Sequence, residues 1–277
     1  YDPNVDGLGY AQSRDIYGSG YDDYSIGPST IETNAKITPI LSPDTSYTLT
    51  IDLINSAQVS LDIEQMYFKD GLSGITDAII NAHNRGVTVR LIVDESGSDS
   101  IPLNQLETAG ITIRISEENA AEGNYFDTQH NKGIIVDGET VLISSINWSP
   151  TSIFENREAG VIVENTQIAT YFQGLCNYDW NSCQPYDDTV HFISSLGNFP
   201  TLNTEFKIEN DISGSIRSEL IYSPHGASYT NQYTSQTFEG AMNITCLASP
   251  DNCFETVETL LLNAQETIDI SLYTLSS

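Results

Sequence analysis

Basic residues and long apolar runs are both scarce in this sequence. Only 10 of its 277 residues are Lys or Arg, whereas 38 are Asp or Glu, so the formal net charge is −28. A field of this sign repels nucleic acid and anionic membranes unless salt screens it or acid neutralises it. The apolar runs are only a few residues long, whereas a membrane helix needs ~20 apolar residues. The composition therefore excludes a helical membrane span, a collagen and a wholly disordered chain.

Cysteine is also sparse, and its four copies form two local pairs. Cys176 lies close in sequence to Cys183, and Cys246 lies close to Cys253. Four cysteines allow three pairings, and we predict that each one bridges its nearer neighbour, which implies an oxidising compartment. Neither pair has the CxxC or His spacing of a zinc site, so we expect no metal.

The charge and a glycosylation sequon favour the same compartment as the predicted disulfides. Asn243 begins an Asn-Ile-Thr sequon. A very acidic chain suits high salt, where carboxylates stay hydrated, or low pH, where groups with a pKa of ~4 are protonated. An ordinary acidic secreted protein fits equally well. We predict a secreted or extracellular-surface protein, with a high-salt or acidic habitat left open.

Four regions differ in composition along the chain. Residues 1–36 are rich in Gly, Tyr and Asp and are predicted to form an extension. Residues 37–183 alternate between helical and strand patterns, which favours an α/β sandwich with a central mixed, mainly parallel sheet. Residues 184–240 read as a polar connector, and residues 241–277 as the start of a second repeat. The predicted helices are 45–58, 75–84, 103–109 and 166–180, and the predicted strands are 59–67, 87–93, 111–115, 133–137, 140–145 and 158–164.

The second repeat is predicted because a short pattern recurs. The Leu-Ser-Pro-Asp of 41–44 precedes a predicted helix and strand, and the Ala-Ser-Pro-Asp of 248–251 precedes a predicted helix, 254–264, and strand, 267–273. Such a recurrence indicates duplicated architecture. A strand without neighbours leaves its edges unsatisfied, so we expect another part of a longer precursor to complete the second repeat.

Residues able to do chemistry are concentrated between 130 and 147. His130 and Lys132 are two residues apart, so on a strand both side chains share one face. The Asp-Gly pair at 137–138 predicts a tight hairpin turn, which would return Asn147 to the neighbourhood of His130. An imidazole nucleophile, a cation and an amide donor suit phosphoryl transfer, which needs an attacking base and donors to the non-bridging oxygens.

At these residues the sequence resembles the phospholipase D superfamily. The family motif is His-x-Lys, four residues, Asp, six residues and Gly-Ser-x-Asn, and every spacing matches, with Ser144 where the family usually has Gly. The resemblance covers roughly residues 37–180, and residues 241–277 resemble the start of a second family repeat. It implies a phospholipase D-like α/β sandwich that works without a metal or another cofactor.

The resemblance also implies a role for each matching residue. His130 would be the nucleophile that forms a phosphohistidine, or the acid that protonates the leaving group. Lys132 and Asn147 would hold phosphate oxygens, with Ser145 as a further donor. Glu158 would accept a hydrogen bond from the His130 ring and fix its tautomer.

These features together predict a phosphodiesterase of phospholipase D type, in which Asp137 is structural and braces the hairpin. The family site takes two motifs and this sequence has one, so we expect either the C-terminal remainder of the same precursor or a second identical subunit as partner. A phospholipid headgroup is slightly favoured over nucleic acid as substrate, and no stable nucleic-acid complex is expected, because Lys and Arg are scarce. The alternatives are an extracellular nuclease and a surface or assembly protein that keeps the fold without catalysis.

Overall fold

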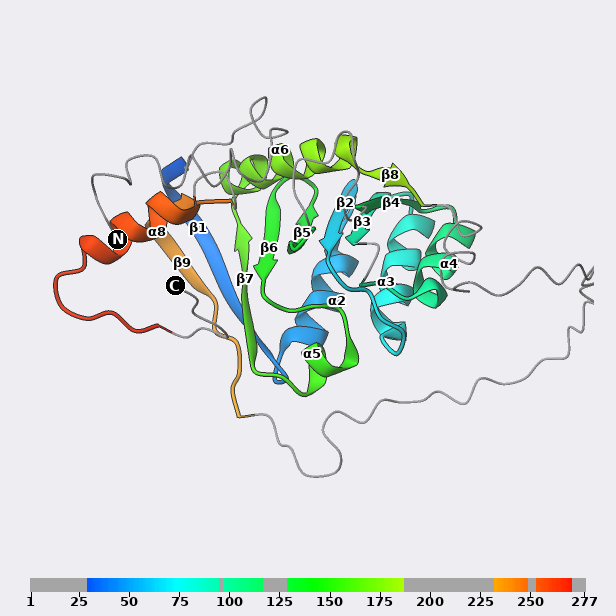
Figure 1. The fold of residues 1–277 in the computed structure, drawn as a ribbon, viewed down its shortest axis with the longest axis horizontal. Coiled ribbons are helices and arrows are strands. Elements are labelled where there is room, and N and C mark those ends of the chain that lie inside the picture. Colours follow the sequence, from blue (N-terminus) through cyan, green and yellow to red (C-terminus); the bar gives the residue numbers. More distant parts are fainter. Residues whose placement is uncertain (1–28, 95–96, 117–128, 187–231, 249–252, 271–277) are drawn as a thin grey trace, which may run out of the picture. The chain divides into compact units, whose positions relative to one another are not determined.

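The computed structural model describes residues 29–94, 97–116, 129–186, 232–248 and 253–270 (Figure 1). The chain divides into two units. The larger is Lys36–Phe238, and the smaller combines Tyr1–Ala35 with Glu239–Ser277. All the candidate catalytic residues lie in the larger unit.

A mixed β-sheet forms the centre of the larger unit. Its strands follow the order β8-β4-β3-β2-β5-β6-β7-β1. The pairs β2–β3 and β3–β4 are parallel, and the other pairs in this order are antiparallel. The strands are β1 (Ser29–Ser42), β2 (Ser60–Gln65), β3 (Thr88–Asp94), β4 (Thr112–Ser116), β5 (Lys132–Val136), β6 (Thr140–Ser144), β7 (Glu158–Glu164) and β8 (Gln184–Pro185).

The α/β fold with a mixed sheet is confirmed, but most strand pairs are antiparallel rather than parallel. Parallel pairs arise only where a helix carries the chain from β2 to β3 and from β3 to β4. The predicted turn joins β5 directly to β6, with φ of 55° at Asp137 and 66° at Gly138. A three-residue connection of this kind, residues 137–139, permits only an antiparallel pair.

Helices cover both faces of this sheet (Figure 1). On one face, α2 (Ser46–Ser56), α3 (Ser73–Asn84) and α4 (Ser100–Thr108) contribute to the hydrophobic core, which also contains the inward-facing residues of β2 and β3, such as Ile63 and Leu91. Because side chains alternate along a strand, the residues between them face the other side.

The second face is covered by α6 (Thr166–Ser182). Asp62 of β2 points to this side, where it accepts a hydrogen bond from Gln173 of α6 at 2.9 Å. The face beneath α6 therefore carries polar side chains, whereas the opposite face holds the hydrophobic core. A short helix, α5 (Pro150–Phe154), lies between β6 and β7 and begins with a side-chain cap from Ser149.

The smaller unit contains the end of the described chain. β9 (Phe238–Cys246) lies beside β1, and the hydroxyls of Thr30 and Thr245 are 3.0 Å apart. The predicted helix 254–264 is confirmed as α8 (Cys253–Leu262). A strand was also predicted at 267–273. Residues 267–270 are irregular instead, and residues 271–273 lie outside the described residues.

Candidate active site

The candidate residues gather at one edge of the sheet. His130 precedes β5 by one residue, and Lys132 is the first residue of that strand. Since β5, β6 and β7 are successively antiparallel, β6 ends and β7 begins at this same edge. Ser145 and Glu158 lie at these two positions. The strand register therefore places Lys132, Ser145 and Glu158 at one edge of the sheet.

Lys132 is held against His130. Its Nζ atom lies 2.8 Å from Nδ1 of the His130 ring and donates to the His130 carbonyl at 2.7 Å. The lysine is only 5% exposed. Burial lowers the pKa of Lys132 to about 8, against the opposing effect of the nearby carboxylates of Glu158 and Asp94. Lys132 is therefore a buried cation near the limit of its charged range at neutral pH.

The environment of the His130 ring favours its neutral form. Burial lowers its pKa from the ordinary value of 6.5, the charge of Lys132 lowers it further, and Asp94 opposes the shift. An ammonium can only donate, so Nδ1 accepts from Lys132 and the neutral ring carries its proton on Nε2. This arrangement keeps the imidazole uncharged, as a nucleophile requires.

Glu158 is bound differently from the expectation. One carboxylate oxygen accepts from the Ser145 hydroxyl at 3.0 Å, and the other accepts from the Asn156 amide at 3.1 Å. The His130 ring, in contrast, makes its hydrogen bond with Lys132. The expected His130–Glu158 bond is thus replaced by contacts to two nearer donors, and Ser145 is engaged with Glu158.

Asn147 is positioned by its neighbour Trp148. Trp148 is 1% exposed and packs edge-on against Phe68, with 5.0 Å between the ring centroids. Backbone bonds from Trp148 to Tyr67 and from Lys69 to Trp148 fix the chain at this point. The Oδ1 atom of Asn147 is buried and has no hydrogen-bond partner. This oxygen can accept a hydrogen bond from a donor group of a ligand.

Asp137 acts as the predicted brace. Its carboxylate accepts hydrogen bonds from the backbone N–H groups of Gln58, Val59 and Ser60, at 2.7 to 3.2 Å. These bonds lower the pKa of Asp137, although burial acts in the opposite direction. The hairpin that carries Lys132 is therefore tied to the chain just before β2. The structural role of Asp137 stays a prediction, and these hydrogen bonds support it.

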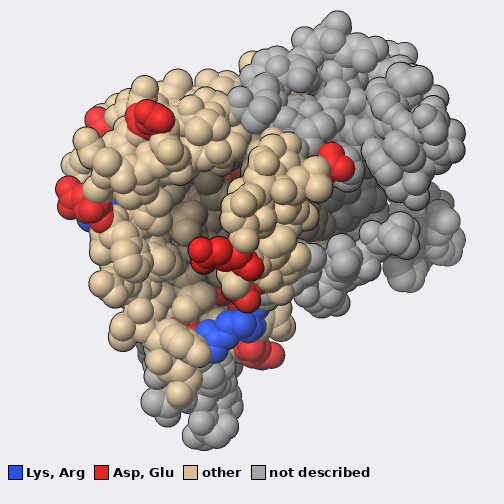
Figure 2. Space-filling view, turned by 90° about the vertical axis from the view of Figure 1, so that its left-hand side faces the viewer, with Lys and Arg blue, Asp and Glu red and all other residues tan. Residues whose placement is uncertain are grey.

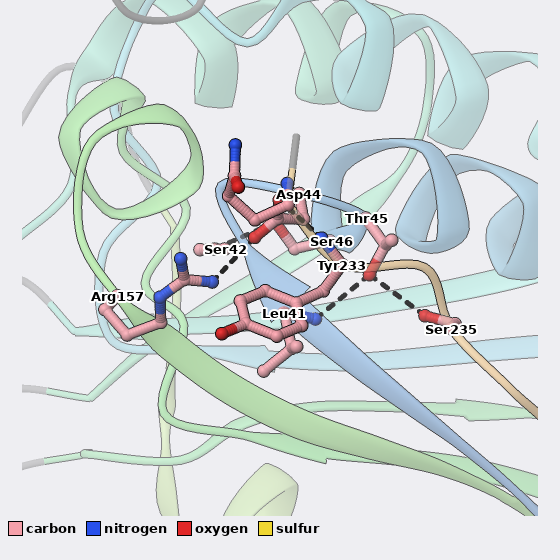
Figure 3. Close-up of polar contacts among 9 residues, drawn as sticks. Leu41, Ser42, Asp44, Thr45, Ser46, Arg157, Tyr233 and Ser235 are labelled. Carbon is pink, nitrogen blue, oxygen red and sulfur yellow. Dashed lines mark hydrogen bonds and ion pairs between the residues drawn. The ribbon is translucent and has the colours of Figure 1, made fainter. Parts of the chain in front are cut away.

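A buried carboxylate next to the catalytic edge was not anticipated from the sequence. Asp44 follows the end of β1, whose Ser42 pairs with Glu158. Arg157 donates to the Asp44 carboxylate at 2.6 Å, and the backbone N–H groups of Gln232 and Tyr233 donate to its other oxygen (Figure 3). The guanidinium also lies 5.3 Å from the centre of the Tyr233 ring.

This Asp44 cluster connects the segment after residue 231 to the catalytic edge. Ser235 extends the connection through a hydrogen bond to Thr45 (Figure 3). Sequence spacing gave no sign of it, because Asp44 is separated by 113 residues from Arg157. Asp94 was missed too, although a carboxylate at the carboxyl end of a buried parallel strand is a common site signal.

The predicted disulfides are not formed, and the structure corrects this prediction. All four cysteines are free thiols. Cys176 lies within α6 and Cys183 is the C-cap of that helix. At ~1.5 Å per residue, seven helical positions separate the Cα atoms by ~10 Å, whereas a disulfide tolerates ~7 Å. Cys246 ends β9, Cys253 begins α8, and they are likewise unbonded. Burial raises the pKa of the Cys183 thiol to about 12.

Three further properties concern ligands and surfaces. Within the described ranges no group of His, Cys, Asp and Glu is arranged to hold a metal ion. None of the helices in that part of the chain combines the length and apolar character of a membrane span. On the face drawn in Figure 2, acidic side chains are scattered and basic ones are few.

Comparison with known proteins links this site to a family. The family model described as cardiolipin synthase, PLD-like domain, matches residues 50–180, which include the whole motif. A mitochondrial cardiolipin hydrolase from Danio rerio is 29% identical over 146 residues, covering 51% of this chain and 60% of the relative. A phospholipase D from Rickettsia felis is 30% identical over 147 residues, covering 52% of this chain and 69% of the relative.

The chain is also similar to a solved structure. NUC from Salmonella typhimurium, a phospholipase D family member, has a TM-score of 0.48 and 26% identity, and the match covers 58% of this chain and 99% of that one. The chain spans only 60% and 58% of the length of the cardiolipin hydrolases from Danio rerio and Chlamydomonas reinhardtii. With a complete motif at the observed edge and a phospholipase D relative matched over 69% of its length, the chain belongs to the phospholipase D superfamily.

Proposed function

We propose that this protein is a phosphodiesterase in which His130 is the nucleophile. The observation that carries the proposal is the pairing of the His130 ring with the buried Lys132 ammonium at 2.8 Å, at the edge that also holds Ser145, Asn147 and Glu158. A neutral imidazole beside a cation supplies both an attacking group and a partner for phosphate charge. Family membership supports the same chemistry.

The reaction begins when a phosphate oxygen binds the Lys132 ammonium in place of the ring. Nδ1 of His130 is then free to take the ring proton, which leaves a lone pair on Nε2. Nε2 attacks phosphorus, so that a P–N bond forms while the P–O bond to the leaving group breaks. The leaving oxygen takes a proton from an acid. Water then attacks phosphorus, the P–N bond breaks and the imidazole is restored.

We assign that acid to the histidine of a second motif. The motif comes either from a second copy of this chain or from a further repeat of a longer chain. Support comes from the single complete motif of the sequence and from the repeat signal that ends in α8. Sedimentation and intact mass of the active species distinguish the two sources, since only the first gives a complex of identical chains.

The proposed substrate is a phospholipid rather than a nucleic acid. Curated relatives carry the names phospholipase D and mitochondrial cardiolipin hydrolase. The net charge of −28 opposes binding of a polyanion such as DNA, which proteins hold with many Lys and Arg contacts. Export from the cell is proposed as well, on the acidic composition and the sequon at Asn243, and a glycan at Asn243 in protein from its native source would support it.

Hydrolysis by purified protein tests the proposal. A chromogenic phosphodiester, phospholipid vesicles and single-stranded DNA are compared as substrates for the wild type, His130→Ala and Lys132→Ala. We expect vesicle hydrolysis to exceed DNA hydrolysis, loss of activity in His130→Ala, and a loss of ~10²-fold or more in Lys132→Ala. The matched control is His83→Ala, in the last turn of α3 and outside the site.

Two outcomes would contradict the proposal. Activity above a few per cent in His130→Ala would remove the nucleophile assignment. No hydrolysis of any substrate by the wild-type assembly would favour a surface or assembly protein that keeps the fold without catalysis.

A further inference from the structure

Two carboxyl groups are buried beneath α6, on the face of the sheet opposite Lys132. Glu64 of β2 is 8% exposed, and Asp179 of α6 is 4% exposed. Burial raises the pKa of Glu64 well above its ordinary value, and the adjoining Asp179 carboxyl, which is in hydrogen-bonding contact, raises it further. Two carboxyls in such contact cannot both be ionised, so the pair shares a proton. The chemistry proposed above uses neither group.

The pair is connected to both neighbours of His130. Gln129, which is 2% exposed, directs its amide nitrogen at Asp179 at 3.5 Å. The amide of Asn131 donates to Glu64 at 2.9 Å. The side-chain oxygen of Gln129, Oε1, also accepts from the backbone N–H of Asn131 at 2.9 Å, so the contacts of the two residues are linked.

The contacts of Gln129 and Asn131 anchor the chain on both sides of His130. Both side chains lie in the layer beneath α6, whereas Lys132, the first residue of β5, points to the other face. The residue between two anchored neighbours has little freedom in its backbone. Buried hydrogen bonds of this kind restrict movement, because displacing Asn131 or Gln129 leaves a further buried polar group unpaired.

Arg90, a cation on the same side of the sheet, is already engaged. Arg90 on β3 binds Asp62 at 2.5 Å and also donates to Asn177 at 2.8 Å. Asp62 and Gln173 therefore form a separate set of contacts between β2 and α6, one that does not reach His130. These contacts provide a matched comparison, because they join the same strand to the same helix.

We propose that Glu64 and Asp179 are positioning residues, which hold the His130 backbone in place through Asn131 and Gln129. The inference rests on the proposed function for its catalytic consequence, but the position of His130 can be measured without activity. Neither carboxyl contacts the substrate. Their contribution is to fix the ring against Lys132, and misplacement of a reacting group by about 1 Å can cost ~10² in rate.

Three variants and one control test the proposal. Asp179→Leu removes the acceptor for Gln129, whereas Asp179→Asn keeps an acceptor and removes only the acid. Gln129→Met removes both side-chain contacts of Gln129 and leaves the carboxyl pair intact. Gln173→Leu is the control, since it breaks the separate contact of α6 with Asp62.

The readouts are the kinetic constants on a phosphodiester and the pKa of His130 from the NMR titration of its ring. The ring signal is identified by its absence in His130→Ala. We expect Asp179→Leu and Gln129→Met to lower kcat by ~10-fold or more with KM within about twofold. Because a loosened ring becomes more hydrated, its pKa should rise toward 6.5 in both variants. Asp179→Asn and Gln173→Leu should resemble the wild type.

The outcomes separate the two proposals. An unchanged His130 pKa and unchanged kcat in folded Gln129→Met would overturn the positioning role, and so would equal losses in Gln173→Leu. If Asp179→Leu fails to fold, Gln129→Met and Asp179→Asn still decide the matter. If the wild type hydrolyses nothing, the proposed function fails, and the His130 pKa of the variants still tests the network.

Discussion

Raising the pH should remove the charge of Lys132 and so stop the proposed reaction. We expect this loss at a pH well below the range in which lysines normally titrate. Burial sets the pKa of Lys132 at about 8 instead of 10.5. The phosphate needs the ammonium form, so activity falls as pH rises through this value. At pH 9 about one tenth of Lys132 remains charged, and kcat/KM should be about tenfold below its maximum.

The acid side of the same profile is governed by His130. The ring attacks only when it is neutral, so activity rises as pH increases through its pKa. Burial and the charge of Lys132 lower that pKa from 6.5, so the rise should be complete near neutral pH. The profile of kcat/KM is therefore bell-shaped, and its two limbs report the free protein.

Rates on a chromogenic phosphodiester between pH 5 and pH 10 provide the assay, with the product measured after each sample is adjusted to one pH. Lys132→Arg is the informative variant, because a guanidinium stays charged throughout this range and should abolish the alkaline limb even if the overall rate drops. His83→Ala should retain both limbs. The reasoning is refuted if the wild type keeps full activity at pH 10, or if Lys132→Arg loses activity above pH 8 as the wild type does.

Three further predictions concern stability and thiols. Asp137→Ala should lower the free energy of unfolding by ~1–3 kcal/mol, because three backbone donors lose their acceptor, and Asp137→Asn should cost less in urea denaturation. Asp44→Ala should cost ~2 kcal/mol and speed hydrogen exchange at the amides of Gln232 and Tyr233; unchanged exchange at both would contradict the observed contacts. Protein denatured without reductant should release the thiols of all four cysteines, and native protein should react slowly at the buried Cys176.

Local patterns predicted the central elements well. The alternation of β7 and the apolar spacing of α3 are strong short-range signals, and the structure places them at Glu158–Glu164 and Ser73–Asn84. The motif spacing also placed His130, Lys132 and Asp137, because their arrangement depends on one strand and one turn. These features need no information from distant parts of the chain.

Features that depend on distant partners were missed or misjudged. β1 and β9 alternate between polar and apolar residues only weakly, so their places in the sheet depend on neighbours far along the chain. The bridge predicted between Cys176 and Cys183 assumed a loop, whereas a continuous helix keeps the two thiols apart. The partner of Glu158 was misjudged because the position of Asn156, two residues away, depends on how the chain turns into β7.

The most direct test of the central claim is to trap the covalent intermediate. The protein is mixed with a phosphodiester and the reaction is quenched with alkali, because phosphohistidine is stable at high pH. The protein is then digested for mass spectrometry. A nucleophilic His130 predicts a phosphoryl adduct on the peptide that contains residues 129–132, and no adduct in His130→Ala. An actively hydrolysing protein with no adduct at His130, or with the adduct on another residue, would contradict it.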